Sequence, residues 1–186
     1  MSSERMHRVT LRPVEIESDV HLLYRWLGDA HVNRWYREGE HTIENYRLRF
    51  APEPTTRKFI IEIDAEPAGY LQAYRLSDEP AYATQLELGH DAVSIDLFLG
   101  EATFRGAGWG SVVLQAALEQ IVFGEMAAEW ACINPDPENV RAVKSYEKAG
   151  FGGDRVVWVQ DDAPENTGYE RIMLLSRDEF RRTRGL

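Results

Sequence analysis

Residues 105–110, Arg-Gly-Ala-Gly-Trp-Gly, form the pattern in this chain best suited to bind a ligand. Its three glycines let the backbone approach a ligand closely and point successive N–H groups into one concavity. An apolar helix is expected to begin at Ser111, and the first turn of a helix carries partial positive charge. The pattern therefore predicts a site for a phosphate or diphosphate. A glycine-rich loop that merely turns the chain is the alternative.

Two common nucleotide-binding motifs do not fit this loop. A dinucleotide fingerprint needs a third glycine where Ser111 stands, and a Walker loop needs Gly-Lys-Ser/Thr, whereas this loop has no lysine. A third pattern, Arg/Gln-x-x-Gly-x-Gly/Ala, holds the pyrophosphate of coenzyme A. Arg105, Gly108 and Gly110 satisfy that pattern.

Asp96 and Tyr146 are the candidate groups for proton transfer. Asp96 alternates with Ile95 and Leu97 in a predicted strand, so it points to the opposite face of the sheet. A carboxylate among apolar neighbours can bind an ammonium ion and accept its proton, although a solvent-facing acid fits the same pattern. Tyr146 shares a helix face with Ala142 and Ala149, where it is either a packed aromatic ring or a functional hydroxyl.

Strand and helix patterns alternate along the whole chain, with no linker or repeat. Ser18 or Asp19 is the expected N-cap of the first helix, and Asp136, followed by Pro137, that of the helix ending at Ala149. Ser176 and Glu179 form a capping box for a last short helix. We expect one domain, residues 1–186, of the α+β (mixed α/β) class built on a central sheet. The predicted strands are 9–12, 59–63, 68–74, 92–99, 129–133, 156–160 and 169–175; the predicted helices begin at 18 or 19, 42, 111 and 137, and a hairpin joins the second and third strands.

The composition narrows the class of protein. The chain has 186 residues, 44% of them hydrophobic, a formal net charge of −10 and a single cysteine. It shows no secretory signal and no run of about 20 apolar residues, so we expect a cytoplasmic protein that contacts no membrane. The negative charge disfavours nucleic acid, and the five histidines show no metal-ligand spacing. Six acids and no Lys or Arg lie between residues 76 and 104. This acidic segment is interpreted either as a solvated face or as the wall of a site for a cationic substrate.

Residues 139–151, Asn-Val-Arg-Ala-Val-Lys-Ser-Tyr-Glu-Lys-Ala-Gly-Phe, resemble the closing motif of the GCN5-related N-acetyltransferase (GNAT) superfamily. The glycine loop stands about 30 residues upstream, in the order this family has. Further segments resemble the aminoglycoside 6'-N-acetyltransferases, among them Leu-Tyr-Arg-Trp-Leu at 23–27, His-Val-Asn-Arg-Trp-Tyr at 31–36, Gly-Tyr-Leu-Gln-Ala-Tyr at 69–74 and Ile-Asp-Leu-Phe-Leu at 95–99. The resemblance covers most of the chain and is weakest at 77–92 and 154–168.

The resemblance implies that acetyl-CoA lies between two splayed parallel strands, 92–99 and 129–133. From the single cysteine and the histidine spacing we expect no metal. Tyr146 would protonate the departing thiolate, and Asp96 would bind the acceptor amine and take its proton, for direct attack on the thioester. The implied cofactor-binding residues are Leu97, Phe98, Leu99, Arg105, Gly106, Ala107, Gly108, Trp109, Gly110, Ser111 and Asn139. The candidate acceptor-binding residues are Trp35, Tyr36, Gln72, Tyr74, Asp96 and Asn134, the last standing where those enzymes often have an aspartate. The first four could line the pocket because aromatic faces attract cations and pack on sugar rings, and each taken singly also fits a core or surface position.

The expected activity is acetyl transfer to a primary amine of a small cationic substrate, with an aminoglycoside, and hence antibiotic resistance, as the first interpretation. Acylation of a lysine derivative, a siderophore precursor, a polyamine or a protein lysine is the second interpretation. A coenzyme A-binding module without turnover is the third. As partners we expect the small cationic amine and no nucleic acid, for a monomer or a homodimer.

Overall fold

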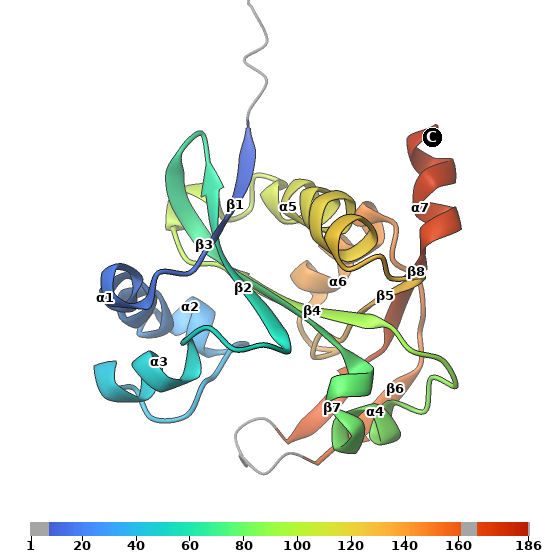
Figure 1. Cartoon of the computed structure of the whole chain (residues 1–186), viewed down its shortest axis with the longest axis horizontal. Helices are drawn as coiled ribbons and strands as arrows, with labels where there is room; N and C mark the ends of the chain where they lie inside the picture. The colour runs from blue at the N-terminus through green and yellow to red at the C-terminus, as the bar shows by residue number, and fades with distance from the viewer. Residues whose placement is uncertain (1–7, 161–166, 186) are drawn as a thin grey trace, which may run out of the picture.

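A six-stranded mixed sheet forms the centre of the protein, described here from a computed structural model of residues 8–160 and 167–185 (Figure 1). Its order is β1-β2-β3-β4-β5-β8, and β4–β5 is its parallel pair while the other pairs are antiparallel. This confirms the predicted mixed α/β class. The strands are β1 (Val9–Pro13), β2 (Thr56–Ile63), β3 (Glu66–Arg75), β4 (Val93–Leu99), β5 (Trp130–Ile133) and β8 (Met173–Ser176).

The hairpin of β2 and β3 sets the register of the site-bearing strand. Asp64 and Ala65 adopt φ values of 54° and 67°, the left-handed conformations that a tight hairpin turn requires. β3 then pairs with β4 so that Gln72 lies directly opposite Asp96. The hairpin that the sequence predicted is therefore confirmed, and it fixes which side chains face Asp96.

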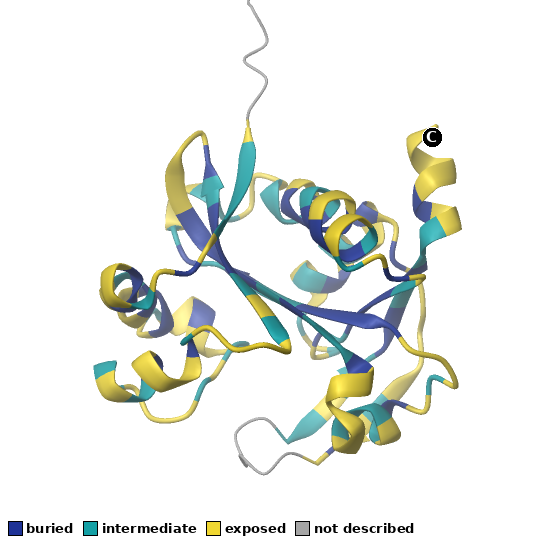
Figure 2. Cartoon of the chain, in the orientation of Figure 1, coloured by how far each residue is buried: buried dark blue, intermediate teal, exposed yellow. Residues whose placement is uncertain are grey.

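Helices cover the two faces of the sheet with separate apolar cores (Figure 2). Ile95 belongs to the core beneath α5 (Trp109–Ala117) and α6 (Val140–Ala149), which α7 (Arg177–Arg184) completes through Phe180. Phe98 belongs to the core on the other face, beneath α1 (Ile16–Leu27), α2 (Ala30–Asn33) and α3 (Ile43–Arg49). Alternation along β4 therefore places Asp96 on the α1–α3 side, opposite Ile95, as the sequence predicted.

A third apolar cluster lies under α4 (Pro80–Leu86), a helix that the sequence analysis did not predict. Leu86 packs there with Cys132 of β5 and with Val159 of β6. The strands β6 (Val156–Val159) and β7 (Gly168–Arg171) form a separate antiparallel pair beside α4. Short 3₁₀ turns, η1 (Leu76–Asp78) and η2 (Ala102–Phe104), complete the connections. In the part of the chain that the structure describes, no helix is long and apolar enough to span a membrane.

Several predicted boundaries were wrong. The N-cap of α1 is Glu15 rather than Ser18 or Asp19, because the Asp19 carboxylate is taken by the Arg12 guanidinium at 2.9 Å and by the Glu15 N–H at 2.8 Å. The N-cap of α6 is Asn139, which accepts a hydrogen bond from the N–H of Ala142 at 3.2 Å. α6 therefore begins one turn later than an Asp136 cap with Pro137 at the first helical position predicted.

Two further expectations need adjustment. The helix predicted from Ser111 begins at Trp109, so its first turn includes the end of the glycine loop, and it continues as a π-helical stretch, η3 (Leu118–Glu125). The strand predicted at 169–175 is two strands: β7 pairs with β6, β8 joins the main sheet, and Ile172 between them packs into the third cluster.

The parallel strands β4 and β5 pair over only two residues, at the start of β4. Val93 pairs with Ala131 and Ser94 with Cys132, after which β4 continues to Leu99 without further pairing to β5. The splayed strands that the family resemblance implied are therefore present, and the separation leaves the second half of β4 without a sheet neighbour on that side.

Gly69 allows β3 and β4 to lie close enough to bring Gln72 against Asp96. A Cβ at this position would stand 2.1 Å from the carbonyl oxygen of Phe98, so the backbones would have to separate. We expect Gly69→Ala to lower the free energy of unfolding by about 1–3 kcal/mol, measured by chemical denaturation. Gly152→Ala is the control, because nothing lies within 4 Å of its added Cβ; equal effects of both variants would contradict the close approach.

Candidate functional site

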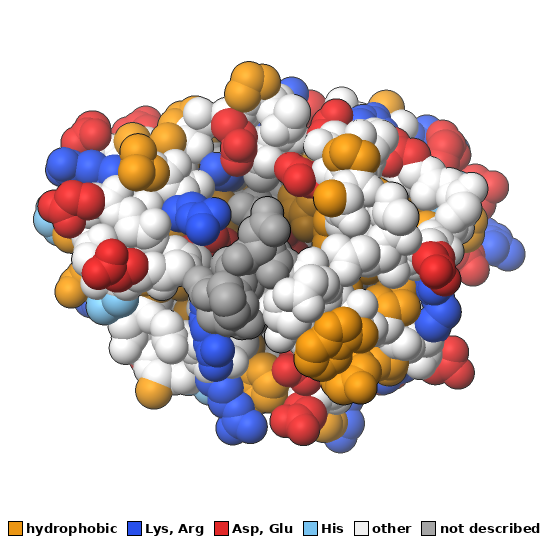
Figure 3. Space-filling model, turned by 90° about the horizontal axis from the view of Figure 1, so that it is seen from below, with side chains coloured by type: hydrophobic (Ala, Val, Ile, Leu, Met, Phe, Trp, Pro, Cys, Tyr) orange, Lys and Arg blue, Asp and Glu red, His pale blue; other side chains and the backbone are white. Residues whose placement is uncertain are grey.

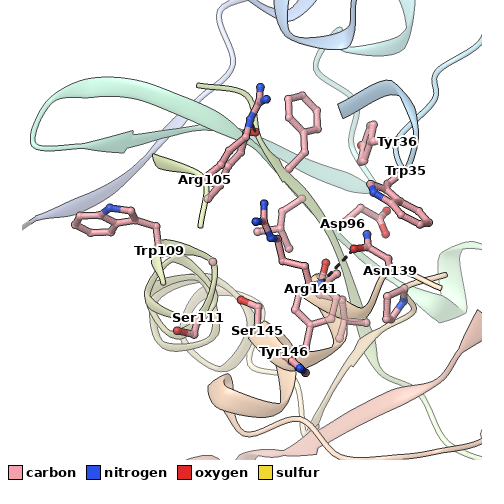
Figure 4. A pocket seen from close by; sticks show the side chains of 18 of the residues that line it. Trp35, Tyr36, Asp96, Arg105, Trp109, Ser111, Asn139, Arg141, Ser145 and Tyr146 are labelled. Carbon is pink, nitrogen blue, oxygen red and sulfur yellow. Dashed lines mark hydrogen bonds between the residues drawn. The ribbon is translucent and has the colours of Figure 1, made fainter. Parts of the chain in front are cut away.

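A cleft of about 470 Å³ opens where β4 and β5 separate, and we call it the donor cleft. Its walls come from the second half of β4, from the glycine loop, and from α2 and α6, as Figure 4 shows for the labelled side chains. Of the predicted cofactor-binding residues, all except Ala107 line it: Leu97, Phe98, Leu99, Arg105, Gly106, Gly108, Trp109, Gly110, Ser111 and Asn139.

The glycine loop has the backbone conformation that its composition predicted. Gly106 and Gly108 adopt φ values of 80° and 86°, and Gly108 is the N-cap of α5. Ser111 is buried and its hydroxyl donates to the carbonyl of Gly108 at 3.0 Å, which braces the first turn. Gly110 lies so close to α6 that an added Cβ would be 2.5 Å from Ser145 Oγ. The loop therefore presents the amino end of α5 to the donor cleft, a favourable position for an anion.

The guanidinium of Arg105 is used mainly to hold the loop in place. It donates to the carbonyls of Leu99 at 3.1 Å and of Gly100, and its two N–H arms reach the Asp29 carboxylate at 3.2 Å. Asp29 in turn caps α2 by accepting from the N–H of His31 at 2.8 Å. The guanidinium therefore connects β4, the loop and α2.

Three cations of α6 that the sequence analysis did not select also line the donor cleft: Arg141, Lys144 and Lys148. Arg141 and Lys148 lie within van der Waals contact of the loop: a Cβ added at Gly106 would be 3.6 Å from Arg141 Nη2, and one added at Gly108 would be 3.8 Å from Lys148 Nζ. Their spacing of three and four residues places them along one side of a helix, and that spacing was the available sequence signal. Together with the loop amides they give the donor cleft a positive wall.

A second cleft, of about 770 Å³, adjoins the donor cleft, and we call it the acidic cleft. It lies on the face seen from below, where charged side chains surround a hollow (Figure 3). Lys58 is one of four Lys and Arg residues in the described part of its lining, and its ammonium is already engaged by Glu53 at 2.6 Å and by two backbone carbonyls. Among the residues that the structure describes, six acids line the acidic cleft: Glu38, Glu53, Glu79, Asp96, Asp136 and Glu170.

The two clefts meet at Asp96. Five residues line both of them: Trp35, Tyr36, Asp96, Asn134 and Asp136. In Figure 4, Trp35 and Tyr36 lie beside Asp96, whereas Trp109 lies at the opposite end of the donor cleft. The predicted acceptor residues Gln72 and Tyr74 line the acidic cleft alone. The structure thus brings all six predicted acceptor-binding residues around one cavity.

Hydrogen bonds hold the Asp96 carboxylate in a defined orientation. The Tyr70 hydroxyl donates to Gln72 Oε1 at 3.0 Å, and Gln72 Nε2 donates to Asp96 Oδ2 at 2.8 Å. Burial raises the pKa of Asp96, while hydrogen bonds from Gln72 and Tyr74 partly oppose the rise. A carboxylate with a raised pKa is a stronger base, so this arrangement suits Asp96 to accept a proton.

Tyr146 lines the donor cleft and packs against the core beneath α6. Burial, reinforced by the negative charge of Asp96, raises its pKa. The phenol therefore keeps its proton at neutral pH, which is the form that a general acid needs.

Other titratable groups differ in what they can contribute. Burial raises the pKa of Cys132 to about 12, so this thiol is neutral and unsuited to act as a nucleophile. Glu38, which the sequence analysis did not select, has its pKa raised to about 7 by burial and by the charge of Asp96. Within residues 8–160 and 167–185, no three His, Cys, Asp or Glu side chains are grouped so as to hold a metal ion.

The sequence and the structure were compared with known proteins. A family model described as an acetyltransferase (GNAT) domain matches residues 15–158. An aminoglycoside N(6')-acetyltransferase type 1 of Klebsiella pneumoniae is 29% identical over 184 residues, covering 96% of this chain and 88% of the relative. A crystal structure of an aminoglycoside acetyltransferase in complex with coenzyme A and kanamycin has a TM-score of 0.78 at 27% identity, covering 95% of this chain and 99% of that one.

The raised pKa of Glu38 is directly measurable. We expect the ¹³C resonance of its carboxyl carbon to titrate with a midpoint of about 7. Asp96→Asn removes a nearby negative charge and should lower this midpoint, because ionised Glu38 then meets less repulsion. Glu79→Gln, which alters another acid of the same cleft, is the control and should leave the midpoint in place. A midpoint below 5 in the unmodified protein would contradict the burial of this carboxyl group.

Proposed function

The chain belongs to the GNAT acetyltransferase family, and from this premise we propose that it transfers the acetyl group of acetyl-CoA to a primary amine of an aminoglycoside. The observation that carries the proposal is the meeting of a positive, loop-lined cleft and an acidic cleft at one buried carboxylate, Asp96. The relatives similar along nearly the whole chain include aminoglycoside acetyltransferases, one of them solved with coenzyme A and kanamycin.

The donor cleft fits the chemistry of acetyl-CoA, the expected acetyl donor. The diphosphate is matched by the amino end of α5 and by the cations of α6, Arg141, Lys144 and Lys148. The backbone of β4 beyond Ser94 no longer pairs with β5, so its polar groups on that side, apart from the Leu99 carbonyl that Arg105 engages, are available to the amide-bearing arm of the donor. Asn139 lines the same cleft, and because its Oδ1 caps α6, we assign its amide nitrogen to the donor arm.

The acidic cleft fits a polycationic acceptor. Carboxylates of Glu38, Glu79 and Glu170 line it together with Asp96, and ammonium groups are attracted to such a wall. Tyr36 and Trp35 stand at the junction, where aromatic rings pack against sugar rings and attract cations. An aminoglycoside offers both features, a sugar scaffold and several ammonium groups.

The proposed reaction uses two residues at the junction. Acetyl-CoA supplies the activated acetyl thioester. Asp96 binds the acceptor ammonium and takes its proton, directly or through water, so that the free amine attacks the thioester carbonyl. The new bond joins nitrogen to the acetyl carbon, and the carbon–sulfur bond breaks. Tyr146 gives its phenolic proton to the departing thiolate, and the second proton that the acylated nitrogen must lose returns to the Tyr146 phenolate. General acid catalysis of this kind contributes about 10²–10⁴-fold.

A thiol-release screen tests the function. Aminoglycosides, polyamines and lysine derivatives are compared as acceptors with acetyl-CoA, and we expect the highest kcat/KM for aminoglycosides. Asp96→Asn should lower that value at pH 7 by about a hundredfold or more, and the deficit should narrow toward pH 10 because free amines then need no base. Preferred turnover of lysine derivatives or polyamines would replace the aminoglycoside assignment. Binding of acetyl-CoA without thiol release on any amine would point to a non-catalytic module.

Tyr146→Phe tests the proposed acid. The phenyl ring keeps the packing but has no proton to give, so we expect kcat to fall about a hundredfold or more. The dissociation constant of acetyl-CoA, measured by calorimetry, should change less than about twofold. An equal loss of both quantities would mean that Tyr146 serves packing rather than proton transfer.

A further inference from the structure

A chain of four hydrogen-bonded side chains connects β5, α4 and β7 along the wall of the acidic cleft. The Cys132 thiol donates to Asn134 Oδ1 at 3.1 Å, and Asn134 Nδ2 donates to the Tyr82 hydroxyl at 2.8 Å. The Tyr82 hydroxyl then donates to Glu170 Oε2 at 2.7 Å. Tyr82, Asn134 and Glu170 all line the acidic cleft, so the chain leads from the buried end of β5 to a carboxylate in that cleft.

The direction of each hydrogen bond in this chain is fixed by its first member. Cys132 is fully buried, and its pKa of about 12 keeps the thiol protonated, so it is a donor at neutral pH. The amide oxygen of Asn134 therefore faces the thiol, and its NH₂ group faces Tyr82. Because the oxygen of Tyr82 receives that N–H, the proton of the hydroxyl is directed to Glu170. A carboxylate that accepts such a bond is held in one orientation.

The helix that carries Tyr82 is itself tied to the neighbouring ribbon. Gln85 Nε2 donates to the carbonyl of Gln160 at 3.0 Å, and the N–H of Gln160 donates back to Gln85 Oε1 at 2.7 Å. Arg155 also donates to the carbonyl of Leu86. Leu86 is completely buried in the third apolar cluster. The packing of Leu86 and the hydrogen bonds that Gln85 and Leu86 make to Gln160 and Arg155 therefore fix the helix that carries Tyr82.

We propose that Glu170, oriented by Tyr82, binds a second ammonium group of the acceptor and thereby selects acceptors that carry at least two such groups. The inference rests on the proposed function, in which Asp96 at the junction of the clefts binds the reacting amine. Glu170 lines the acidic cleft but not the donor cleft, so it meets a part of the acceptor other than the reacting amine. Glu170 is the binding residue, and Tyr82 and Asn134 are positioning residues.

The amide at position 134 is essential to this arrangement. A carboxylate there would accept the proton of Tyr82 rather than donate to its oxygen, and the hydroxyl would turn away from Glu170. Because Asn134 is neutral, the carboxylate of this hydrogen-bonded chain is Glu170 on β7 and not a side chain at the end of β5. Asn134→Asp should therefore weaken the selection even though it adds one negative charge to the cleft.

The test compares two acceptors that present the same reacting group with different charge. Kanamycin carries several ammonium groups, and methyl 6-amino-6-deoxyglucoside carries one. We expect Glu170→Gln and Tyr82→Phe each to raise the KM for kanamycin about five- to thirtyfold. The KM for the monoamine and the kcat for both acceptors should change less than about twofold. The double variant should resemble Glu170→Gln alone, because Tyr82 acts through that carboxylate.

Matched variants separate positioning from general effects of charge and folding. Glu147→Gln removes an acid that pairs with Arg171 outside both clefts, and it should leave the KM for kanamycin unchanged. Cys132→Val removes the donor that orients Asn134 and should raise this KM, whereas Cys132→Ser keeps a donor and should restore it. Melting temperatures of all variants verify that the fold is retained.

Calorimetry with kanamycin distinguishes failure of this inference from failure of the proposed function. Acetylation of kanamycin with a KM that neither Glu170→Gln nor Tyr82→Phe alters would overturn the inference and leave the function intact. If kanamycin binds but is not acetylated, and Glu170→Gln still weakens its binding about five- to thirtyfold, the second cation position stands and the acetyltransferase assignment for this acceptor fails. An equal rise in KM for the monoamine would also overturn the inference.

Discussion

The site depends on the separation of two parallel strands. Had β4 and β5 paired along their whole length, the backbone of Leu97 to Leu99 would be satisfied within the sheet and no cleft would open. The ladder ends instead at Ser94 and Cys132. The strands cannot close because the glycine loop and α6 stand at the far end of the gap, with Gly110 against Ser145. The backbone groups of β4 that have no partner on β5 therefore lie at the wall of the donor cleft.

The position of Asp96 follows from the same strand. Its neighbours Ile95 and Leu97 pack under α5 and α6, so the alternation of the strand requires Asp96 to face the opposite side. There the carboxylate is desolvated, and Gln72 and Tyr74 supply the hydrogen bonds that limit the cost of burial. The result is a base of raised pKa at the point where the two clefts meet. Packing on one face of β4 thus determines the chemistry on the other.

The sequence could predict what depends on local pattern. The alternation in β4, the hairpin before it and the glycines of the loop each carry a local signal, and the structure has all three. It could not predict α4, because residues 80–86 are mostly small or polar and their helix is stabilised by Leu86 packing against distant strands. Tyr82 was missed together with its helix. Glu170 lies in a stretch that was predicted as a strand, but no local pattern shows that this strand borders the acidic cleft. Asp136 and Asn139 are both good N-caps, so composition alone could not settle where α6 begins.

The donor cleft and the acidic cleft have linings of opposite charge, which suits the proposed pair of an anionic donor and a cationic acceptor. The net charge of −10 attracts a cationic acceptor and repels a polyanionic donor. At physiological salt, however, charges are screened beyond about 8 Å, so the potential inside a cleft is set by its own lining. Arg141, Lys144, Lys148 and the amide dipoles of α5 line the donor cleft and favour a phosphate, whereas Glu38, Asp96 and Glu170 line the acidic cleft and favour an ammonium group. The boundary between the two linings passes through Asp96, which is where the proposed reaction brings donor and acceptor together.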